Sequence, residues 1–405
     1  MKTLYKTDEV KNPPRFRILY LQSTSEISGT DITLFRTLEL LDRTRFEPHV
    51  IIPKEGPLTE AFIRIGCRIH ILPDMRKLTR HRNTFQHICF ILNYLPAIFK
   101  ITKVIYREKI DLVHTNTIHN LYGFLAAKMT KKPHVWHIRE IVVQSNIMRF
   151  IEKYLVQWFS TRFIVMSNAI AELFLGSGDG FPSKIVKLYD GVDIEKFNPK
   201  ISGIRIRREL GLAELTPVVG MVTRLDPWKG IEFVLEAANL VLKEIPSAKF
   251  LLCGGEIEGH TGYQTSLKEK TAKLGIEKSV LFTGWTYCHE DIPEVYASLN
   301  VFVHCPLHPE PYGLTNIEAM ACGLPIVTVG LGGPAEICVG GETAYFVPPA
   351  DSRAIAEGIL KLLINPEQAK QMGKAGRLRV ETFFDRRQCV KKLEAIYDEI
   401  LAPLK

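Results

Sequence analysis

Two carboxylates, Glu310 and Glu318, flank the predicted start of a short helix. The apolar run 301–303 predicts a buried strand, and after a proline-rich loop a helix opens near Gly313 or Leu314. A helix that follows a strand points its free N–H groups at the carboxyl edge of the sheet, where an anion can bind. Carboxylates at that place can hydrogen-bond sugar and ribose hydroxyls while the backbone holds a phosphate. The segment therefore predicts half of a nucleotide-sugar site.

The same residues allow a purely structural interpretation. Thr315 and Glu318 have the spacing of a capping box, in which a threonine caps a helix and a glutamate three residues later bonds back to it. Glu318 would then only stabilise its own helix.

Two cations follow another predicted strand. Arg224 and Lys229 come after the apolar run 218–223 and stand just before a helix that starts near Gly230. Two cations beside a helix N-terminus suit a diphosphate, because charge-assisted hydrogen bonds add to the helix dipole. The alternative is a pair of solvated surface cations.

The first half of the chain offers weaker candidates. Gly29 lies in the first strand-to-helix turn, where it could bring backbone close to a phosphate or a sugar. His114 and His137 fall near the ends of predicted parallel strands, and Arg139 and Glu140 follow the second histidine. The glycine-rich patterns of dinucleotide dehydrogenases and of P-loop nucleotidases do not occur, which disfavours both classes.

These residues need a framework of strands and helices, and apolar strand patterns alternate with helical patterns along the chain. Strands that are apolar throughout are typical of a parallel sheet covered on both faces. The predicted strands are 16–23, 48–53, 67–73, 112–116, 135–139, 163–167, 185–188, 218–223, 250–253, 280–283, 301–304 and 326–329. We therefore predict an α/β protein with two Rossmann-like, doubly wound parallel-sheet domains facing across a cleft.

The chain of 405 residues is too long for one hydrophobic core. Residues 189–199 are rich in turn-forming types and form the candidate linker. We place the domains at residues 14–195 and 196–385, and we expect a final helix within 386–405 to pack back on the first domain.

Charge is unevenly distributed between the two halves. Residues 1–200 carry 30 Lys and Arg against 19 Asp and Glu, whereas the remainder carries 22 against 25. A basic first half suggests that the halves meet different partners. An apolar helix predicted at 85–107, preceded by cations between 76 and 82, could rest on an anionic membrane surface, or it could be an ordinary core helix with a basic flank.

The eight cysteines form no C-x-x-C pair, so we expect reduced, buried thiols rather than disulfides or a zinc site. The first thirteen residues are charged and lack the apolar core of a secretory signal. The longest apolar run, 88–99, is too short to span a bilayer. These features favour a cytoplasmic location, with contact at the inner face of the membrane as an option.

Taken together, the ordered motifs resemble a known family. The stretch from Glu310 to Pro325, with glutamates at 310 and 318, resembles the signature of retaining, nucleotide-sugar-dependent glycosyltransferases of the GT-B fold, the glycogen-synthase-like family 4 group. Residues 223–225 with 229–230 are similar to that family's Arg/Lys diphosphate motif, and residues 332–336 and 341–349 match its following segments. The resemblance is close over the second half and loose over the first.

The resemblance implies roles for the candidate residues. Glu310 would contact the donor sugar and Glu318 the ribose, while Arg224 and Lys229 would bind the diphosphate and stabilise it as it leaves. The remaining residues implied at the donor are Gly313, Leu314 and Thr315 at the helix start, His137 near the sugar, and Gly29 in place of the family's glycine-rich loop. Four of these form the catalytic set that we predict: Glu310, His137, Arg224 and Lys229.

The first half departs from the family pattern in three places. The usual paired glycines read Gly29-Thr30, the common H-x-H reads 114–116 with an asparagine last, and the usual N-G-V-D begins with Asp190. The departures leave the donor and acceptor contacts open.

The resemblance further implies hexosyl transfer from a nucleotide-diphosphate sugar with retained configuration and without a metal or other cofactor. The first domain would bind a glycan, lipid-linked or small-molecule acceptor and the second domain the donor, in cell-surface polysaccharide or glycoconjugate synthesis, and no nucleic acid is expected as a partner. Two alternatives remain: a nucleotide-sugar epimerase on the same fold, and a non-catalytic sugar-nucleotide binding protein.

Overall fold

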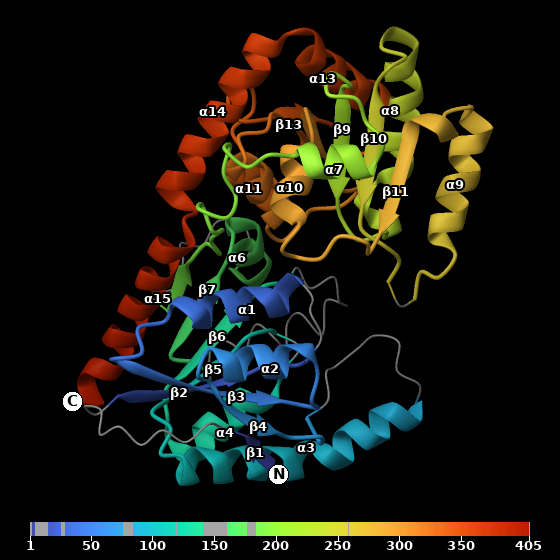
Figure 1. Ribbon diagram of the computed structural model, residues 1–405. Coiled ribbons are helices and arrows are strands. Elements are labelled where there is room, and N and C mark those ends of the chain that lie inside the picture. Colours follow the sequence, from blue (N-terminus) through green and yellow to red (C-terminus); the bar gives the residue numbers. More distant parts are fainter. Residues whose placement is uncertain are drawn as a thin grey trace. The chain divides into compact units, whose positions relative to one another are not determined.

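The computed structural model describes residues 2–4, 15–25, 29–75, 84–118, 120–140, 160–175, 184–257 and 259–404. The chain divides into two compact units (Figure 1). Unit 1 comprises Met1–Asp190 and Arg386–Lys405, and unit 2 comprises Gly191–Asp385. The first unit therefore ends at Asp190, five residues before the domain boundary predicted at residue 195. Each unit is built on a parallel sheet, which confirms the predicted α/β class.

Unit 1 contains an eight-stranded sheet in the order β1-β4-β3-β2-β5-β6-β7-β8. Its strands are β1 (Lys2–Leu4), β2 (Phe16–Leu21), β3 (Phe46–Ile52), β4 (Arg68–Ile71), β5 (Leu112–Thr115), β6 (His134–Ile138), β7 (Arg162–Val165) and β8 (Ile185–Lys187). Strand β1 is antiparallel to β4, and the other pairs are parallel. The chain reverses its direction of travel across the sheet between β2 and β5.

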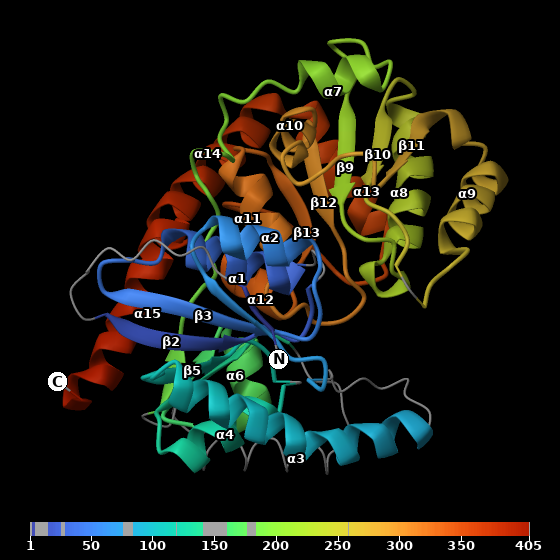
Figure 2. The ribbon, with the colours of Figure 1, turned by 60° about the horizontal axis from the view of Figure 1, so that its bottom comes forward.

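Helices cover both faces of this sheet, which explains why its strands are apolar throughout. Ile18 and Tyr20 of β2 pack with α1 (Gly29–Leu40), α2 (Pro57–Arg64) and the final helix α15 (Arg386–Leu401). Leu19 and Leu21 pack on the opposite face with α3 (Thr84–Arg107) and α4 (Tyr122–Thr130), which lie side by side in Figures 1 and 2. Helix α6 (Asn168–Leu175) follows β7.

The final helix is joined to unit 1 through buried hydrogen bonds as well as apolar contacts. The hydroxyl of Tyr397 lies 3.1 Å from that of Tyr20 and 2.7 Å from Nδ1 of His114. At the helix start, Arg386 donates to Glu39 of α1 at 2.7 Å. The last helix of the chain thus completes the core of the first unit.

Unit 2 contains a six-stranded parallel sheet in the order β11-β10-β9-β12-β13-β14. Its strands are β9 (Val218–Val222), β10 (Lys249–Cys253), β11 (Val280–Gly284), β12 (Val301–His304), β13 (Ile326–Val329) and β14 (Tyr345–Val347). From β9 the chain builds outward to β11 and then returns to place β12 against the other edge of β9. The point between β9 and β12 is therefore a topological switch point, where open α/β sheets bind ligands.

The helices of unit 2 also lie on both faces of its sheet, with α8 and α13 on one face (Figure 2). In chain order they are α7 (Ile204–Glu209), the 3₁₀ turn η1 (Pro227–Lys229), α8 (Ile231–Glu244), α9 (Tyr263–Leu274), η2 (Glu277–Ser279), α10 (Ile292–Ala297), α11 (Leu314–Ala321), α12 (Gly333–Ile337), α13 (Ser352–Ile364) and α14 (Pro366–Phe383). The chain ends with η3 (Ala402–Leu404) in unit 1.

A few sequence predictions are corrected or lie outside the described residues. Helix α1 begins at Gly29, so the glycine predicted to lie in the strand-to-helix turn is already the first residue of the helix. Cys288 is exposed, whereas the other six cysteines whose side chains are described are buried, and all seven are free thiols. The cations between residues 76 and 82, which precede α3 in the sequence, fall among undescribed residues. Among the helices that the structure describes, none combines the length and the hydropathy of a membrane-spanning segment.

Candidate functional site

Two loops meet at the switch point of unit 2, one after β9 and one after β12. The amide of Leu307 donates to the carbonyl of Trp228 at 2.8 Å, which ties the loops together. Gly230 has a left-handed φ of 70°, and a Cβ there would overlap the carbonyl oxygen of Cys305. Only glycine adopts this φ without strain and leaves room for the carbonyl oxygen. The turn before α8 can therefore lie directly against the neighbouring loop.

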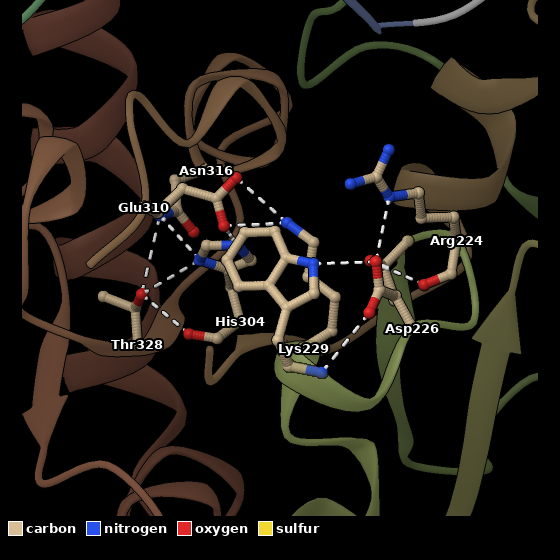
Figure 3. Close-up of polar contacts among 9 residues, drawn as sticks. Arg224, Asp226, Lys229, His304, Glu310, Asn316 and Thr328 are labelled. Carbon is tan, nitrogen blue, oxygen red and sulfur yellow. Dashed lines mark hydrogen bonds and ion pairs between the residues drawn. The ribbon is translucent and has the colours of Figure 1, made fainter. Parts of the chain in front are cut away.

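The central feature of the site is an ion pair between these loops (Figure 3). Nζ of Lys229 lies 2.9 Å from Oε1 and 2.7 Å from Oε2 of Glu310, and 4.0 Å from the ring centroid of Trp228. Both charged side chains are largely buried, with 11% and 14% of their surface exposed. Because the surrounding protein excludes water, each charge is stabilised mainly by the other.

Electrostatics keep the carboxylate of this pair ionised. Burial alone would raise the pKa of Glu310, but the charge of Lys229 and a hydrogen bond from His304 lower the pKa of Glu310 to about 2. Burial lowers the pKa of Lys229, and the attraction of Glu310 opposes that effect. The site therefore presents a charged acceptor beside a buried cation, both of which can be offered to a ligand.

A third loop, after β13, holds the backbone of Glu310. The amide of Gly333 donates to the Glu310 carbonyl at 2.8 Å, and Gly332 pairs with Glu310 as an isolated parallel bridge. Loops from three neighbouring strands thus fix the carboxylate, and rigid support of this kind favours precise ligand geometry.

Arg224 lies on the same loop as Lys229 but is far more accessible. Its side chain is 49% exposed, and its Nε lies 3.6 Å from Oδ2 of Asp226. Asp226 also accepts a hydrogen bond of 2.8 Å from the indole nitrogen of Trp228. The structure therefore brings Lys229 and Glu310 into contact and places Arg224 on the rim of the same loop.

The start of helix α11 leaves free amides for an anion, and its geometry rules out a capping box between Thr315 and Glu318. The N-cap is Gly313, with φ of 93°, so Leu314 and Thr315 are the first two helical residues. Their amides have no acceptor within the helix and can bind an anion. Because Thr315 lies inside the helix, it cannot be the N-cap of a box with Glu318, and that interpretation is wrong.

Glu318 lies on α11 with 6% of its surface exposed. Its Oε2 accepts a hydrogen bond of 3.2 Å from the hydroxyl of Tyr296. That hydroxyl stays protonated, because burial and the charge of Glu318 raise the pKa of Tyr296 well above its usual value. The carboxylate is therefore held in position rather than left to rotate in solvent.

Three further polar residues contact this site and were not singled out from the sequence. His304 ends β12 with its Nε2 3.4 Å from Oε2 of Glu310, Asn316 lies on α11, and Thr328 lies on β13 (Figure 3). A histidine at the end of a parallel strand was the signal used for His137, and the same signal points to His304.

The candidates of the first half lie in unit 1. Gly29 is the first residue of α1. His137 lies within β6 and is 2% exposed, with its Nδ1 3.3 Å from Nη2 of Arg139. Burial, and then the charge of Arg139, lower the pKa of His137 well below its usual value, so its imidazole is neutral.

Asn116 and Asp190, two of the three residues that depart from the family pattern, both contact the side chain of Arg139. Its Nε donates to Oδ1 of Asn116 at 3.0 Å, and its Nη1 pairs with Asp190. Arg139 is 3% exposed, so both partners offset the cost of burying its charge. Asn116 and Asp190 are therefore explained by a buried network that the spacing of motifs did not predict.

Among the described residues, no group of three or more His, Cys, Asp or Glu side chains is arranged to hold a metal ion.

Comparison with family models gives a match for each half of the chain. Residues 27–196 match the model described as Glycosyltransferase Family 4, and residues 204–379 match the model described as Glycosyl transferases group 1. The second match contains Arg224, Lys229, Glu310 and Glu318.

Curated relatives extend over most of the chain. The UDP-Gal:alpha-D-GlcNAc-diphosphoundecaprenol alpha-1,3-galactosyltransferase of Escherichia coli is 27% identical over 333 residues, covering 79% of this chain and 80% of that protein. The capsular polysaccharide biosynthesis glycosyltransferase CapM of Staphylococcus aureus is 25% identical over 377 residues, covering 87% of this chain and 96% of that protein.

Solved structures share the fold. The crystal structure of Anabaena HepE in complex with UDP has a TM-score of 0.82 at 23% identity, covering 95% of this chain and all of that chain. Sucrose-phosphate synthase from Thermosynechococcus elongatus has a TM-score of 0.79 at 21% identity, covering 96% and 100%. The chain belongs to the GT-B glycosyltransferases, with a family 4 domain followed by a group 1 domain.

Proposed function

We propose that this glycosyltransferase moves a hexosyl residue from a nucleotide-diphosphate sugar to a glycan, lipid-linked or small-molecule acceptor, in the synthesis of a cell-surface polysaccharide or glycoconjugate. The observation that carries the proposal is the buried contact of Lys229 with Glu310 at the switch point of unit 2. A cation suited to phosphate and a carboxylate suited to sugar hydroxyls, within one hydrogen bond of each other, support this proposal.

The diphosphate would be bound by two cations and a helix terminus. Lys229 supplies a buried charge, Arg224 supplies an exposed guanidinium, and the first amides of α11 at Leu314 and Thr315 supply neutral donors. Charge-assisted hydrogen bonds to an anion are about twice as strong as neutral ones, and they strengthen further as the phosphate gains charge on leaving.

The sugar and ribose would be held by the two carboxylates. Glu310 stays ionised at neutral pH and accepts hydrogen bonds from sugar hydroxyls once the phosphate shares Lys229. Glu318, fixed by Tyr296, accepts from the ribose. The backbone at Gly313 and Leu314 contributes contacts to the phosphate and sugar.

The transfer would retain the anomeric configuration and need no metal. The bond from the anomeric carbon to the phosphate oxygen breaks, and a bond to the acceptor hydroxyl oxygen forms on the same face. The departing phosphate takes the proton of that hydroxyl, so no protein base is required. The protein contributes positioning and charge stabilisation, with His137 and Gly29 of unit 1 in the implied contacts to the donor.

The names of the relatives support the choice of donor and acceptor classes. The E. coli relative is named for a UDP-galactose donor and a diphosphoundecaprenol-linked acceptor, and the S. aureus relative for capsular polysaccharide synthesis. HepE was solved with UDP-glucose. A nucleotide-sugar donor and a lipid-linked or polysaccharide acceptor follow from this likeness as proposals.

A lipid-linked acceptor would require contact with a membrane, and α3 carries a suitable surface. Leu95, Phe99 and Tyr106 are 60%, 60% and 64% exposed, and with 3.6 residues per turn they lie within roughly 40° of one another on the helix. The exposed Lys103 flanks them. Apolar groups beside cations suit an anionic bilayer, so we place the enzyme at the inner face of the cytoplasmic membrane.

Sedimentation with lipid vesicles tests this surface. The protein should pellet with phosphatidylglycerol vesicles and stay in solution with phosphatidylcholine alone, and the F99S/Y106S variant should lose most of the binding. Equal binding of both proteins would contradict the contact.

The function itself is tested by a donor screen read by mass spectrometry. The protein is incubated with UDP-glucose, UDP-galactose, UDP-N-acetylglucosamine and GDP-mannose, with and without a panel of acceptors. A transferase forms a glycosylated acceptor. Conversion of a donor without any acceptor would indicate the epimerase, and donor binding without transfer to any acceptor would indicate a non-catalytic binding protein.

A further inference from the structure

Two buried side chains connect Glu310 with the interior of unit 2. His304 is 2% exposed and Asn316 is fully buried. Nε2 of His304 lies 3.4 Å from Oε2 of Glu310, and Nδ1 lies 3.2 Å from Nδ2 of Asn316 (Figure 3). The imidazole therefore stands between an amide and the carboxylate assigned to the sugar.

The contacts select one tautomer of this imidazole. Oε2 of the ionised Glu310 can only accept, so Nε2 carries the proton, and Nδ1 then offers its lone pair to the amide nitrogen of Asn316. The hydroxyl of Thr328 also lies 3.4 Å from Nδ1, but it donates its proton to the backbone carbonyl of His304 at the shorter distance of 2.8 Å. The opposite tautomer would set two donors against each other at Nδ1 and aim a lone pair at the carboxylate.

Burial supports the neutral form. It lowers the pKa of His304, and the nearby charge of Lys229 acts in the same direction, while Glu310 opposes both. Oδ1 of Asn316 is buried and has no hydrogen-bond partner among the described residues. The Asn316 side chain thus makes no hydrogen bond through its oxygen to any described residue, while its nitrogen faces the imidazole ring.

We propose that Asn316 and His304 are positioning residues for Glu310. Asn316 keeps the proton of His304 on Nε2, and His304 donates its hydrogen bond to Oε2 of Glu310. Lys229 contacts both carboxylate oxygens, whereas His304 contacts Oε2. When a phosphate draws Lys229, Oε1 becomes the oxygen free to accept from a sugar hydroxyl. The inference rests on the proposed function, because it concerns how the sugar-binding carboxylate is oriented.

Nitrogen-15 NMR of histidine-labelled protein tests the tautomer without any substrate. The His304 signal, assigned by its loss in H304Q, should show a neutral ring with the proton on Nε2 from pH 6 to 8. In N316D a carboxylate faces Nδ1 and should keep the ring doubly protonated at pH 7. A proton on Nδ1 alone, or a charged ring in the wild type, would overturn the proposal.

Transfer kinetics test whether His304 affects the reaction through its hydrogen bond to Glu310. H304Q keeps an N–H donor near the position of Nε2 and should retain most of the transfer activity, whereas H304L should lower kcat/KM by about 10- to 100-fold, as expected for a lost hydrogen bond to a charged group. In an E310A background, which has no acceptor at this position, H304L should have less than about a threefold further effect, because the interaction is already gone.

The failure of this inference differs from failure of the function. If the wild type transfers sugar and H304L matches it, or if H304L costs as much with E310A as without it, the positioning role is wrong. If the wild type transfers no sugar at all, the proposed function is wrong, and the NMR result still decides the tautomer.

Discussion

The carboxylate of Glu310 lies 2.7 Å from the ammonium of Lys229, although 81 positions separate the two residues in the chain. The parallel sheet creates this contact, because β9 and β12 are adjacent and both end at the same edge. A cation suited to phosphate and a carboxylate suited to sugar therefore neutralise each other until a donor enters.

The pair makes the stability of unit 2 depend on acid. The pKa of Glu310 is lowered from 4.5 to about 2 in the folded protein, so its contribution is present above pH 4.5 and is lost as the pH falls toward 2. Urea unfolding between pH 6 and 3 should show the wild type losing stability more steeply than E310Q below pH 4.5. Parallel curves for the two proteins would contradict the pairing.

Gly230, in the turn before α8, should tolerate no side chain. G230A should destabilise the protein by at least about 3 kcal/mol, because the new Cβ meets backbone as well as a left-handed φ. G275A is the matched control: its φ is 69°, nothing lies within 4 Å of an added Cβ, and its cost should be about 1 kcal/mol. Similar thermal unfolding of the two variants would show that the loop contact is unimportant.

Removing the hydroxyl of Tyr397 should weaken the docking of α15 on unit 1. Y397F leaves Nδ1 of His114 without this partner and removes the contact with Tyr20, which should cost about 1–3 kcal/mol. Y106F, which alters an exposed tyrosine, should be neutral. Equal chemical denaturation curves for the two variants would contradict the role of the buried bonds.

Glu318 should distinguish ribose from its deoxy analogue. In the wild type, UDP or GDP, whichever binds, should bind about tenfold or more tightly than its 2′,3′-dideoxy form, as measured by calorimetry, because the hydroxyls bond a charged acceptor. E318Q should lose most of this difference, and E342Q, at an exposed position, should keep it. A difference that survives in E318Q would remove Glu318 from the ribose site.

Much of the fold could be predicted because strands buried on both faces leave an unbroken apolar run. The strands missed are β1 and β14, which have only three residues each. In β14 the run Tyr345–Val347 is apolar but stops at Pro348 and Pro349, so it is too short to stand out from a loop. The alternative interpretation of Thr315 and Glu318 as a capping box fails for a local reason, since Gly313 takes the N-cap position one residue before Leu314.

The site was only partly visible in the sequence. Arg224, Lys229, Glu310 and Glu318 belong to motifs with fixed spacing, whereas the bond between His304 and Asn316 joins a strand to a helix. Single residues of this kind carry no spacing signal, and their partners emerge only from tertiary packing. The same holds for Arg139, whose buried partners explain residues that looked like departures from a family pattern.

The most direct test of the account is the rate of sugar transfer by R224A and K229A, using the donor and acceptor identified in the screen. R208A and K243A, which alter exposed cations of unit 2, serve as controls and should transfer at the wild-type rate. R224A and K229A should each lose about 100-fold or more in kcat, because charge stabilisation of the leaving diphosphate is lost. Near-normal turnover in both variants would contradict the account.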